Sequence, residues 1–423
     1  MQHVFVLDKT KKPLMPCHPA RARQLLRKGK AAVFRHYPFT IILKNRENGN
    51  TQNVRIKIDP GSKHTGIALV GEFKKERKVI WAAVIEHRGD KIHNALQKRC
   101  AVRRNRRQRK TRYRKPRFLN RKRPEGWLPP SLESKISNVI TWVRRLSKWC
   151  PITHISMELV KFDTQKLQNP EISGVEYQQG ELFGYEIREY LLEKWGRKCA
   201  YCGATNVPLE IEHIIPKSRG GTDRISNLTL ACRKCNLAKG NKTAAEFGYP
   251  EIQEKAEKPL KDIASVNSTR WKLYNKLKEF GLSIECGSGG RTKYNRTKQN
   301  YPKDHWIDAA CVGESGENVY ITERLKPLRI VATGWCNRQV CRMDKNGFPR
   351  TSAKIVKKVH GFQTGDLVKA IVTKGKKKGV YIGRVAVRSS GYFNIKTSNS
   401  TIQGIHYKYC KILQHIDGYT YFH

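Results

Sequence analysis

Acidic residues are scarce in this chain, whose 423 residues include 35 Asp and Glu against 84 Lys and Arg. Long apolar stretches are also missing. No run of 18 apolar residues occurs, and the first residues contain no hydrophobic segment of the kind that directs secretion. The sequence therefore offers no membrane-spanning helix, and we expect a soluble protein of the cell interior.

A framework of paired cysteines is absent as well. Four of the 12 cysteines occur as two CxxC pairs, and most of the others are scattered along the chain. This usage is typical of a reducing compartment, in which thiols stay free or bind metal.

The excess of positive charge is large: 84 cations and 35 anions leave a net charge of +49, with a pI near 10.1. This exceeds what solubility needs and indicates a polyanionic partner, because each neutralised phosphate releases counterions. A ribosomal-type protein can be equally basic, but this chain is long enough to bury more than one hydrophobic core.

Positive charge is concentrated in residues 98–123, which hold 15 Lys and Arg and no acid. Nothing breaks a helix before Pro116. A helix this rich in arginine repels itself unless phosphates surround it, and the planar guanidinium suits phosphate. We therefore predict a helix ordered by nucleic acid; a disordered basic arm or a localisation signal is the alternative. The predicted nucleic-acid-binding residues are Arg99, Arg103, Arg104, Arg106, Arg107, Arg109, Lys110, Arg112 and Arg114.

A second motif lies at residues 199–239, where two CxxC pairs flank a Glu-His dipeptide and an Asn follows the second pair. Four thiolates in two pairs satisfy tetrahedral Zn²⁺. Glu212, His213 and Asn236 add hard-metal ligands and a candidate general base. A plain zinc ribbon with a buried polar His213 is the alternative, but a ribbon has no need of the other polar residues. The predicted zinc ligands are Cys199, Cys202, Cys232 and Cys235.

This window resembles the HNH, or ββα-metal, nuclease motif. LEIEHI corresponds to the strand that ends in an acid-His pair, KSRGGTDRISN to the following loop, and CNLAKGNKTAAEF to the helix. The resemblance implies that Glu212 and Asn236 hold one Mg²⁺, that His213 activates water, and that Asn227 braces the loop.

Three other segments place a carboxylate on an apolar strand or helix. Residues 54–70 predict two strands around a tight turn, with Asp59 at the end of the first. HISMELV carries Glu158 on another strand, and DHWIDAACVG predicts a helix with His305 and Asp308 one turn apart. Buried acids are costly unless they are paired or bind metal. The alternative is a turn-capping Asp59 and a surface pair on the helix.

These segments resemble the split RuvC nuclease, which has an RNase H-like α/β fold. Its first strand carries a DxGxxxxG motif, as residues 59–66 do here, and later segments carry a Glu and an HxxD motif. The resemblance implies two Mg²⁺ ions held by Asp59, Glu158 and Asp308, with His305 helping to activate the attacking water. Two such metals stabilise both the attacking and the leaving oxygen.

The order of all these pieces resembles IscB, a transposon-encoded, RNA-guided nuclease family related to type II CRISPR effectors. The sequence PLMP at residues 13–16 matches the motif that names a domain of that family. The resemblance divides the chain into a PLMP domain (1–50), three RuvC segments (51–92, 128–195 and 249–318), an Arg-rich bridge helix (93–127), an HNH nuclease with its zinc site (196–248) and a C-terminal β-rich domain for guide RNA and a target-adjacent motif (319–423).

The predicted fold class is thus multidomain α/β, with an RNase H-like RuvC core, an inserted zinc-containing HNH domain, a bridge helix and a small β-rich C-terminal domain. The resemblance implies a Mg²⁺-dependent, RNA-guided endonuclease that cuts double-stranded DNA, HNH on the guide-paired strand and RuvC on the displaced strand. Expected partners are a long structured guide RNA and target DNA, around a monomeric protein in a prokaryotic cytoplasm, with structural Zn²⁺. A protein-only HNH endonuclease of the homing or restriction type, or a non-catalytic zinc-containing RNA-binding protein, is the alternative.

Overall fold

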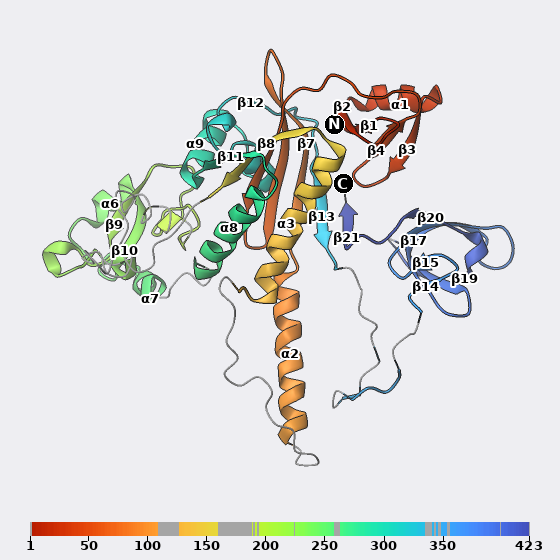
Figure 1. Cartoon of the computed structure of the whole chain (residues 1–423). Coiled ribbons are helices and arrows are strands. Elements are labelled where there is room, and N and C mark those ends of the chain that lie inside the picture. The colour runs from red at the N-terminus through yellow and green to blue at the C-terminus, as the bar shows by residue number, and fades with distance from the viewer. Residues whose placement is uncertain are drawn as a thin grey trace.

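The structure is a computed structural model, and a large mixed β-sheet lies at its centre (Figure 1). The small unit with the two CxxC pairs lies to one side of this sheet, and an N-terminal and a C-terminal β-rich unit lie to the other. The described residues are 2–108, 127–159, 188, 191–192, 194–223, 225–257, 263–334, 341, 344–345, 348–352, 356–397 and 399–422.

The central sheet is assembled from segments far apart in the chain. Its strands are β5 (Val54–Pro60), β6 (His64–Glu72), β7 (Arg77–Glu86), β8 (Ile152–Glu158), β11 (Ser283–Gly287), β12 (Val319–Tyr320), β13 (Leu328–Ala332) and β21 (Tyr419–Phe422). Their order is β11-β8-β5-β6-β7-β13-β21, and β12 pairs with β7. β5, β6 and β7 form an antiparallel meander, while β8 and β11 extend the sheet in parallel beside β5. The two strands predicted within residues 54–70 and the strand that ends at Glu158 are confirmed.

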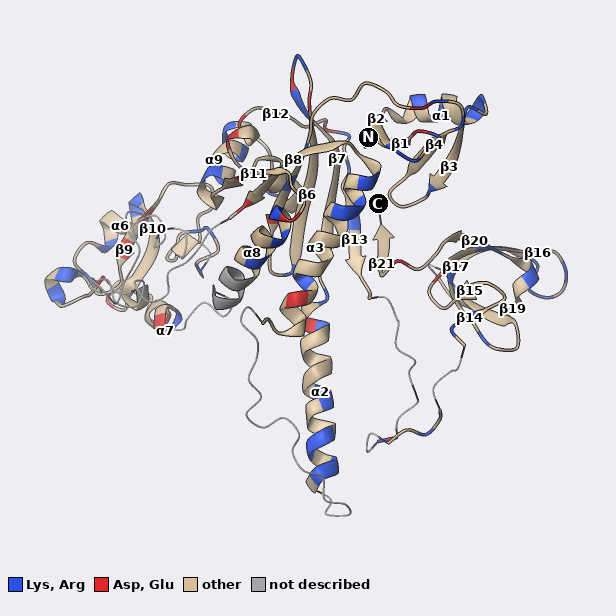
Figure 2. Cartoon of the chain, viewed as in Figure 1, with Lys and Arg blue, Asp and Glu red and all other residues tan. Residues whose placement is uncertain are grey.

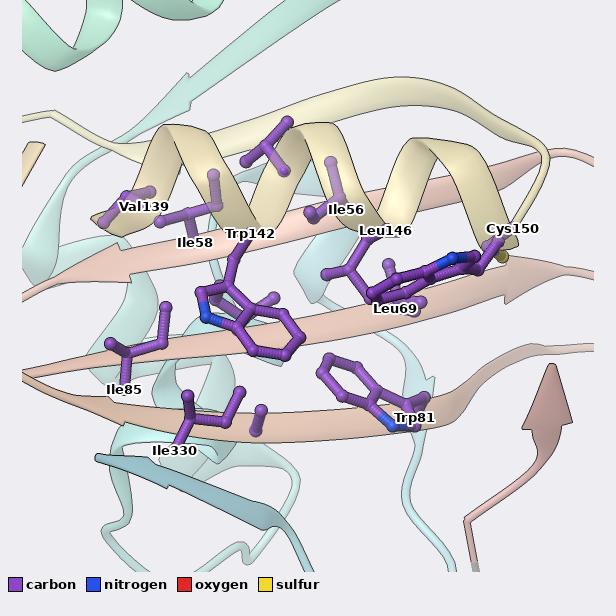
Figure 3. Close-up of a cluster of buried hydrophobic side chains, with 14 of the residues drawn as sticks. Ile56, Ile58, Leu69, Trp81, Ile85, Val139, Trp142, Leu146, Cys150 and Ile330 are labelled. Carbon is purple, nitrogen blue, oxygen red and sulfur yellow. The ribbon is translucent and has the colours of Figure 1, made fainter. Parts of the chain in front are cut away.

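One face of the sheet buries its apolar row against two helices, α3 (Pro130–Trp149) and α8 (Ile263–Lys278). Side chains alternate between the faces of a strand, so Ile56 and Ile58 both face this layer. Trp142 of α3 is fully buried and lies over the sheet (Figure 3). Its replacement by Ala would cost about 3–5 kcal/mol, because the cavity could not collapse in so dense a core.

The opposite face is covered by the short helix α10 (His305–Ala310), and α9 (Gly289–Lys298) lies beside it. Ala68 of β6 belongs to this second layer, since it alternates with the residues that face α3. At Gly66, a Cβ atom would lie 1.8 Å from the carbonyl oxygen of His305. Only glycine allows this close approach, which seats α10 on the sheet edge where β5 ends.

The unit with the CxxC pairs has a hydrophobic core of its own. It contains β9 (Leu209–His213), β10 (Leu228–Cys232), α6 (Arg233–Lys239), α7 (Glu251–Glu257) and two short 3₁₀ helices, η2 (Lys217–Arg219) and η3 (Ile225–Asn227). β9 and β10 pair antiparallel, with His213 opposite Leu228. The predicted strand, loop and helix are present in this order, but β10 follows the loop where no second strand was predicted, and the helix ends at Lys239 rather than continuing toward Phe247.

The N-terminal unit forms one sheet of its own, and the C-terminal unit forms two, one of two strands and one of five. The N-terminal sheet has the order β2-β1-β4-β3, and the larger C-terminal sheet has the order β19-β18-β17-β16-β20. The N-terminal elements are β1 (Val4–Leu7), β2 (Pro13–Cys17), α1 (Pro19–Arg27), β3 (Ala31–Arg35) and β4 (Thr40–Leu43). The C-terminal elements are β14 (Lys358–Val359), β15 (Phe362–Gln363), β16 (Leu367–Val372), β17 (Gly379–Ala386), β18 (Tyr392–Lys396), β19 (Thr401–His406), η5 (Tyr407–Tyr409) and β20 (Cys410–Gln414).

The division of residues 319–423 differs from the one expected. We predict a single β-rich domain there, but β12, β13 and β21 join the central sheet, and only the strands between β13 and β21 form the two separate C-terminal sheets. β13 is buried at Leu328 and Ile330, which pack into the core around Trp142. Apolar alternation predicts such a strand but not the sheet that it joins, because pairing depends on tertiary packing.

Helix α2 (Gly89–Gln108) carries the first half of the Arg-rich run and extends away from the central sheet (Figure 1). Of its 20 residues, Gly89 is the buried one. Arg109, Lys110, Arg112 and Arg114 lie outside the described residues. Within the described ranges, no helix combines the length and apolarity needed to cross a membrane.

Candidate nuclease centres and nucleic-acid interface

The four cysteines predicted to bind zinc come together. The Sγ atoms of Cys199, Cys202, Cys232 and Cys235 all lie within 4.8 Å of one another. In the part of the chain that the structure describes, no other group of three or more His, Cys, Asp or Glu side chains converges in this way. Tetrahedral thiolate coordination requires such convergence, so this four-cysteine cluster could hold a structural Zn²⁺.

Backbone hydrogen bonds position the first pair of thiols. The N–H of Cys199 donates to the carbonyl of Ala204 at 3.0 Å, and the N–H of Ala200 donates to Leu230 of β10 at 2.8 Å. Burial raises the pKa of the Cys199 thiol, but neighbouring backbone N–H groups outweigh burial and lower that pKa to about 7. Such a thiol ionises readily, and the thiolate is the form that binds metal.

His213 ends strand β9 and is held by an acid from the following loop. Its Nε2 lies 2.8 Å from Oδ1 of Asp223, whose other oxygen lies 2.7 Å from Nζ of Lys217. Hydrogen bonds from Lys217 and His213 lower the pKa of Asp223, so its carboxylate is ionised and can only accept. Nε2 of His213 therefore donates to this carboxylate, and in the neutral tautomer the lone pair lies on Nδ1. Asp223 was not predicted, because a loop residue at this distance from His213 has no characteristic spacing.

Glu212 is buried and has a protein partner at each carboxylate oxygen. Its Oε2 accepts a hydrogen bond of 2.6 Å from the Tyr201 hydroxyl, and its Oε1 forms an ion pair with Lys239. Lys239, the last residue of α6, is fully buried and also donates to the carbonyl of His213 at 2.9 Å. Burial and the adjacent Glu212 raise the pKa of Tyr201, so this hydroxyl stays protonated. Both partners were missed, since nothing in the sequence distinguishes them from core or surface residues.

Asn236 contacts a different acid of the same strand. Its Nδ2 donates to Oε2 of Glu210 at 2.7 Å, and Arg233 lies 3.6 Å from the other oxygen of Glu210. Glu210 and Glu212 are two residues apart on β9 and so share a face. The oxygen atoms of Glu210, Glu212 and Asn236 are the hard donors that Mg²⁺ prefers, but a metal ligated by Glu212 would have to replace Lys239 or Tyr201.

Asn227 braces the loop between β9 and α6, as predicted. Its Oδ1 accepts from the N–H of Ile215, and its Nδ2 donates to the carbonyls of Ile215 and Thr222, each at 2.9 Å. Gly221 permits this packing, because a Cβ there would lie 1.8 Å from the carbonyl oxygen of Ile215. The loop that carries Asp223 is thereby fixed against the end of β9.

The residues predicted for the second centre lie at two neighbouring strand ends of the central sheet and on the helix that packs over them. β5 and β8 run in parallel with Ile58 opposite Met157, so the next residues, Asp59 and Glu158, lie at the C-terminal ends of neighbouring strands. Asp59 is also paired with Gly66, directly beneath His305 of α10. We call Asp59, Glu158, His305 and Asp308 the sheet-edge centre.

Two carboxylates of the sheet-edge centre are paired with arginines. Glu158 lies 3.3 Å from Arg270 of α8, and Asp308 lies 2.8 Å from Arg296 of α9. Burial raises the pKa of Asp308, and Arg296 opposes this effect. The oxygen donors suit Mg²⁺, although their atoms do not converge as the four thiols do. The acids were predicted from the sequence, but neither arginine was.

A second histidine lies beside His305. The rings of His64 and His305 are stacked with centroids 5.2 Å apart. Burial, with the charge of His64, lowers the pKa of His305, so its imidazole is neutral near pH 7 and can accept a proton. His64 lies within the DxGxxxxG motif but outside its fixed positions, and was therefore not singled out.

Helix α2 presents its arginines to solvent. Figure 2 shows basic residues along the half of α2 farthest from the central sheet. Arg99, Arg103, Arg104 and Arg107 are exposed, and Arg106 lies over the Phe348 ring at 5.6 Å. No acid neutralises these charges within residues 98–108 of the helix. The exposed cations form a surface suited to phosphates.

Two protein families match the chain in succession. Residues 4–180 match the family described as RRXRR protein, and residues 199–242 match the family described as HNH endonuclease. The first name spells a motif that this chain carries as RRNRR at residues 103–107. No curated protein matches the chain at a significant level.

Similar solved structures include two Cas9 proteins. One is Streptococcus thermophilus Cas9 in complex with the GGAA PAM, with 12% identity over 61% of this chain and 32% of that chain, at a TM-score of 0.22. The other is the Type II-C Cas9 enzyme from Actinomyces naeslundii, with 13% identity over 62% of this chain and 59% of that chain, at a TM-score of 0.23. The match thus spans about a third of the first protein and less than two thirds of the second. These TM-scores are too low to define a shared fold, so the family matches carry the identification. The two families, in this order, confirm the predicted resemblance: the chain is similar to IscB- and Cas9-type nucleases and contains an HNH endonuclease domain.

Proposed function

We propose that this protein is an RNA-guided endonuclease that cuts double-stranded DNA at two separate metal-dependent centres. The observation that carries RNA guidance is helix α2, which buries only Gly89 and exposes a series of arginines. Such a helix gains little from the protein core, and phosphates on several of its sides would remove the repulsion between its charges. The predicted bridge helix therefore fits a position between guide RNA and protein.

The HNH centre is proposed to cut the guide-paired strand. Glu212 and Asn236 would hold a Mg²⁺ ion, with Glu210 as a further oxygen donor. Nδ1 of His213 would take the proton from the attacking water, while Asp223 keeps the ring in the required tautomer and orientation. The four-cysteine cluster would hold Zn²⁺ and fix the end of β10 against α6, so that these groups keep their geometry.

The sheet-edge centre is proposed to act as the RuvC nuclease on the displaced strand. Asp59, Glu158 and Asp308 would hold two Mg²⁺ ions, and His305 would accept the proton of the attacking water. Mg²⁺ bound at either centre would supply positive charge to the scissile phosphate and its leaving oxygen. The protein would hold the RNA–DNA heteroduplex through its backbone, while base pairing reads the sequence.

Copurification tests RNA guidance. The full-length protein, purified from cells that carry its native genomic surroundings, should retain a discrete long RNA. The complex should cut a DNA duplex whose sequence matches that RNA, in the presence of Mg²⁺, and lose this activity after ribonuclease treatment.

Each alternative function predicts another outcome. A protein-only HNH endonuclease would cut a fixed DNA site after complete removal of RNA. A non-catalytic RNA-binding protein would retain RNA but cut no duplex at any Mg²⁺ concentration. The variant Arg103→Gln/Arg104→Gln/Arg107→Gln separates RNA binding from folding. It should lose RNA, while the HNH unit, which has its own core, remains folded.

A further inference from the structure

Two acids of the sheet-edge centre, Glu158 and Asp308, each form an ion pair with an arginine that is largely buried. The side chains of Arg270 and Glu158 are 12% and 10% exposed, and those of Arg296 and Asp308 are 10% and 17% exposed. The two arginines come from different helices, α8 and α9, and neither belongs to the predicted catalytic motifs. Both are close enough to alter the charge that a metal ion would meet.

The arginine contacts are electrostatic but poorly formed as hydrogen bonds. Arg270 reaches Glu158 through a single hydrogen bond of 3.3 Å. Nε of Arg296 lies 2.8 Å from Asp308, yet this atom lacks hydrogen-bond geometry and is buried without a hydrogen-bond partner among the described residues. Strong arginine–carboxylate pairs are bidentate and well aligned. These contacts therefore neutralise the charge of the carboxylates. They lack the bidentate alignment that would make it hard for a metal ion to replace the arginine.

We propose that Arg270 and Arg296 are resident counter-ions that compete with divalent metal for Glu158 and Asp308, and so set the metal concentration that this centre requires. The inference rests on the proposed metal-binding role of the centre. Three carboxylates contribute three negative charges at most, and the two arginines offset two of them. Loading of metal exchanges arginine contacts for metal contacts, and the displaced guanidinium groups remain nearby as positive charges.

Competition between arginine and metal predicts that removing an arginine raises the affinity of the centre for divalent metal. Arg270→Gln or Arg296→Gln removes one positive charge from beside the carboxylates and should tighten divalent metal binding. One charge a few ångströms from the metal, in the screened interior of a protein, corresponds to a change on the order of tenfold. A purely structural role predicts the opposite, because an unsupported carboxylate would leave its position and bind metal more weakly.

The test is direct Mn²⁺ binding to the full-length protein, monitored by electron paramagnetic resonance of free Mn²⁺. Asp308→Asn identifies the Mn²⁺ that belongs to this centre, because the other metal-binding groups are unchanged. Arg270→Gln and Arg296→Gln should each lower the dissociation constant of that Mn²⁺ by about tenfold. Arg329→Gln is the matched control: it removes the same charge from an exposed pair with Glu86 on the same sheet and should change nothing.

Charge-conserving variants separate competition from packing. Arg270→Lys and Arg296→Lys keep the positive charge and should bind Mn²⁺ much as the wild type does. Unchanged or weaker binding in the Gln variants overturns the inference, as does equal tightening in the Lys variants, while the centre itself stands. If Asp308→Asn removes no Mn²⁺ from the wild type, the proposed metal centre and this inference both fail. Arg270→Gln carries the test if the more deeply placed Arg296→Gln does not fold.

Discussion

The two candidate nuclease centres are built in different ways. The HNH centre and its four-cysteine cluster come from one stretch of chain, residues 199–239, and lie in a unit with its own hydrophobic core. The sheet-edge centre draws its residues from positions between 59 and 308, and only the pairing of β5 with β8 and the seating of α10 on Gly66 bring them together. The first depends on local braces, whereas the second depends on the whole central sheet.

In both centres, acidic side chains are paired with cationic side chains. Glu212 is paired with the buried Lys239, and Glu158 and Asp308 are paired with arginines. A buried carboxylate without a partner is costly, so a protein that must be stable before metal binds needs such counter-ions. The HNH unit uses one lysine at the end of its own short helix, while the sheet-edge centre uses two helices that lie outside its motifs.

Loss of the four-cysteine cluster should separate the two centres most strongly. Cys232→Ser should remove Zn²⁺ from the protein and unfold the HNH unit locally, because structural zinc in small domains contributes about 10–16 kcal/mol of folding free energy. Cutting of the guide-paired strand should stop, while nicking of the displaced strand should continue. Metal analysis of the purified protein, with strand-specific cleavage assays, measures both effects.

The matched control for zinc is Cys100→Ser, which changes an exposed cysteine on α2. It should keep about one zinc per chain and both cuts. A wild-type protein without zinc would contradict the zinc assignment. Loss of the displaced-strand cut in Cys232→Ser would show that the two units do not fold independently.

Single substitutions should inactivate one centre and leave the other active. His213→Ala removes the proposed base of the HNH centre, and Asp59→Ala removes a proposed ligand of the sheet-edge centre. Loss of a positioned base typically slows its reaction about 10²–10⁴-fold. Each variant should therefore nick one strand, and the two should nick opposite strands, as measured with duplexes labelled on either strand. One substitution that stops both cuts would be incompatible with independent centres.

Much of this arrangement can be predicted from the sequence where the signal is local. The CxxC spacing predicts the convergence of four thiols, and the resemblance to the HNH motif implies the brace at Asn227; both sets of contacts lie within a few tens of residues. The alternation in residues 54–70 and the one-turn spacing of His305 and Asp308 predict a strand pair and a helix. The structure has each of these elements. Metal binding and catalytic roles stay predictions.

Contacts between distant segments could not be predicted from the sequence. Lys239, Arg270 and Arg296 look like ordinary helical cations, and only tertiary packing places them beside acids. The same limit explains residues 319–423, since β13 and β21 have unremarkable strand patterns and their sheet is chosen by packing against α3. A charge pattern along a sequence does not reveal which charges face each other when the pairs lie on separate elements.

The Arg-rich helix offers a test that leaves both centres intact. Arg103→Gln/Arg104→Gln/Arg107→Gln removes three exposed charges of α2 and should weaken guide-RNA binding. If all three contact phosphate, the log–log dependence of affinity on salt should fall by about 2–3, since each contact contributes about 0.7–0.9. Salt titration of binding to the copurified RNA measures this slope. Equal slopes and affinities in wild type and variant would mean that α2 does not contact RNA.

A control for the helix keeps its charge while changing its chemistry. The corresponding triple Lys variant should keep most of the salt dependence, because lysine also neutralises phosphate. It should nevertheless bind less tightly wherever the bidentate arginine fork is used. Thermal unfolding of both variants should match the wild type, since exposed arginines contribute little to core packing.

The smallest expected effect concerns the polar network that ties the sheet-edge centre to its sheet. Glu285 of β11 accepts a hydrogen bond of 2.6 Å from Ser156 of β8 and one of 2.9 Å from the N–H of Ser315, just beyond α10, and it lies 3.3 Å from Arg55. Burial alone would raise the pKa of Glu285, but the hydrogen bonds from Ser156 and Ser315 outweigh burial and lower that pKa to about 2.

The lowered pKa fixes the direction of a pH effect. Because the folded-state pKa lies below the ordinary value of 4.5, the ionised Glu285 stabilises the fold fully above that value and loses this contribution as pH falls toward about 2. Glu285→Gln should therefore destabilise the central sheet by about 1–3 kcal/mol at pH 7, and the difference should fall by about half near pH 3. Thermal unfolding of wild type and variant at both pH values measures this, with Glu76→Gln, at an exposed pair with Lys78, as the control. A difference that grows on acidification would mean that the carboxylate is not held as an anion. Since the HNH unit has no part in this network, its zinc content and its cut should be unchanged by Glu285→Gln.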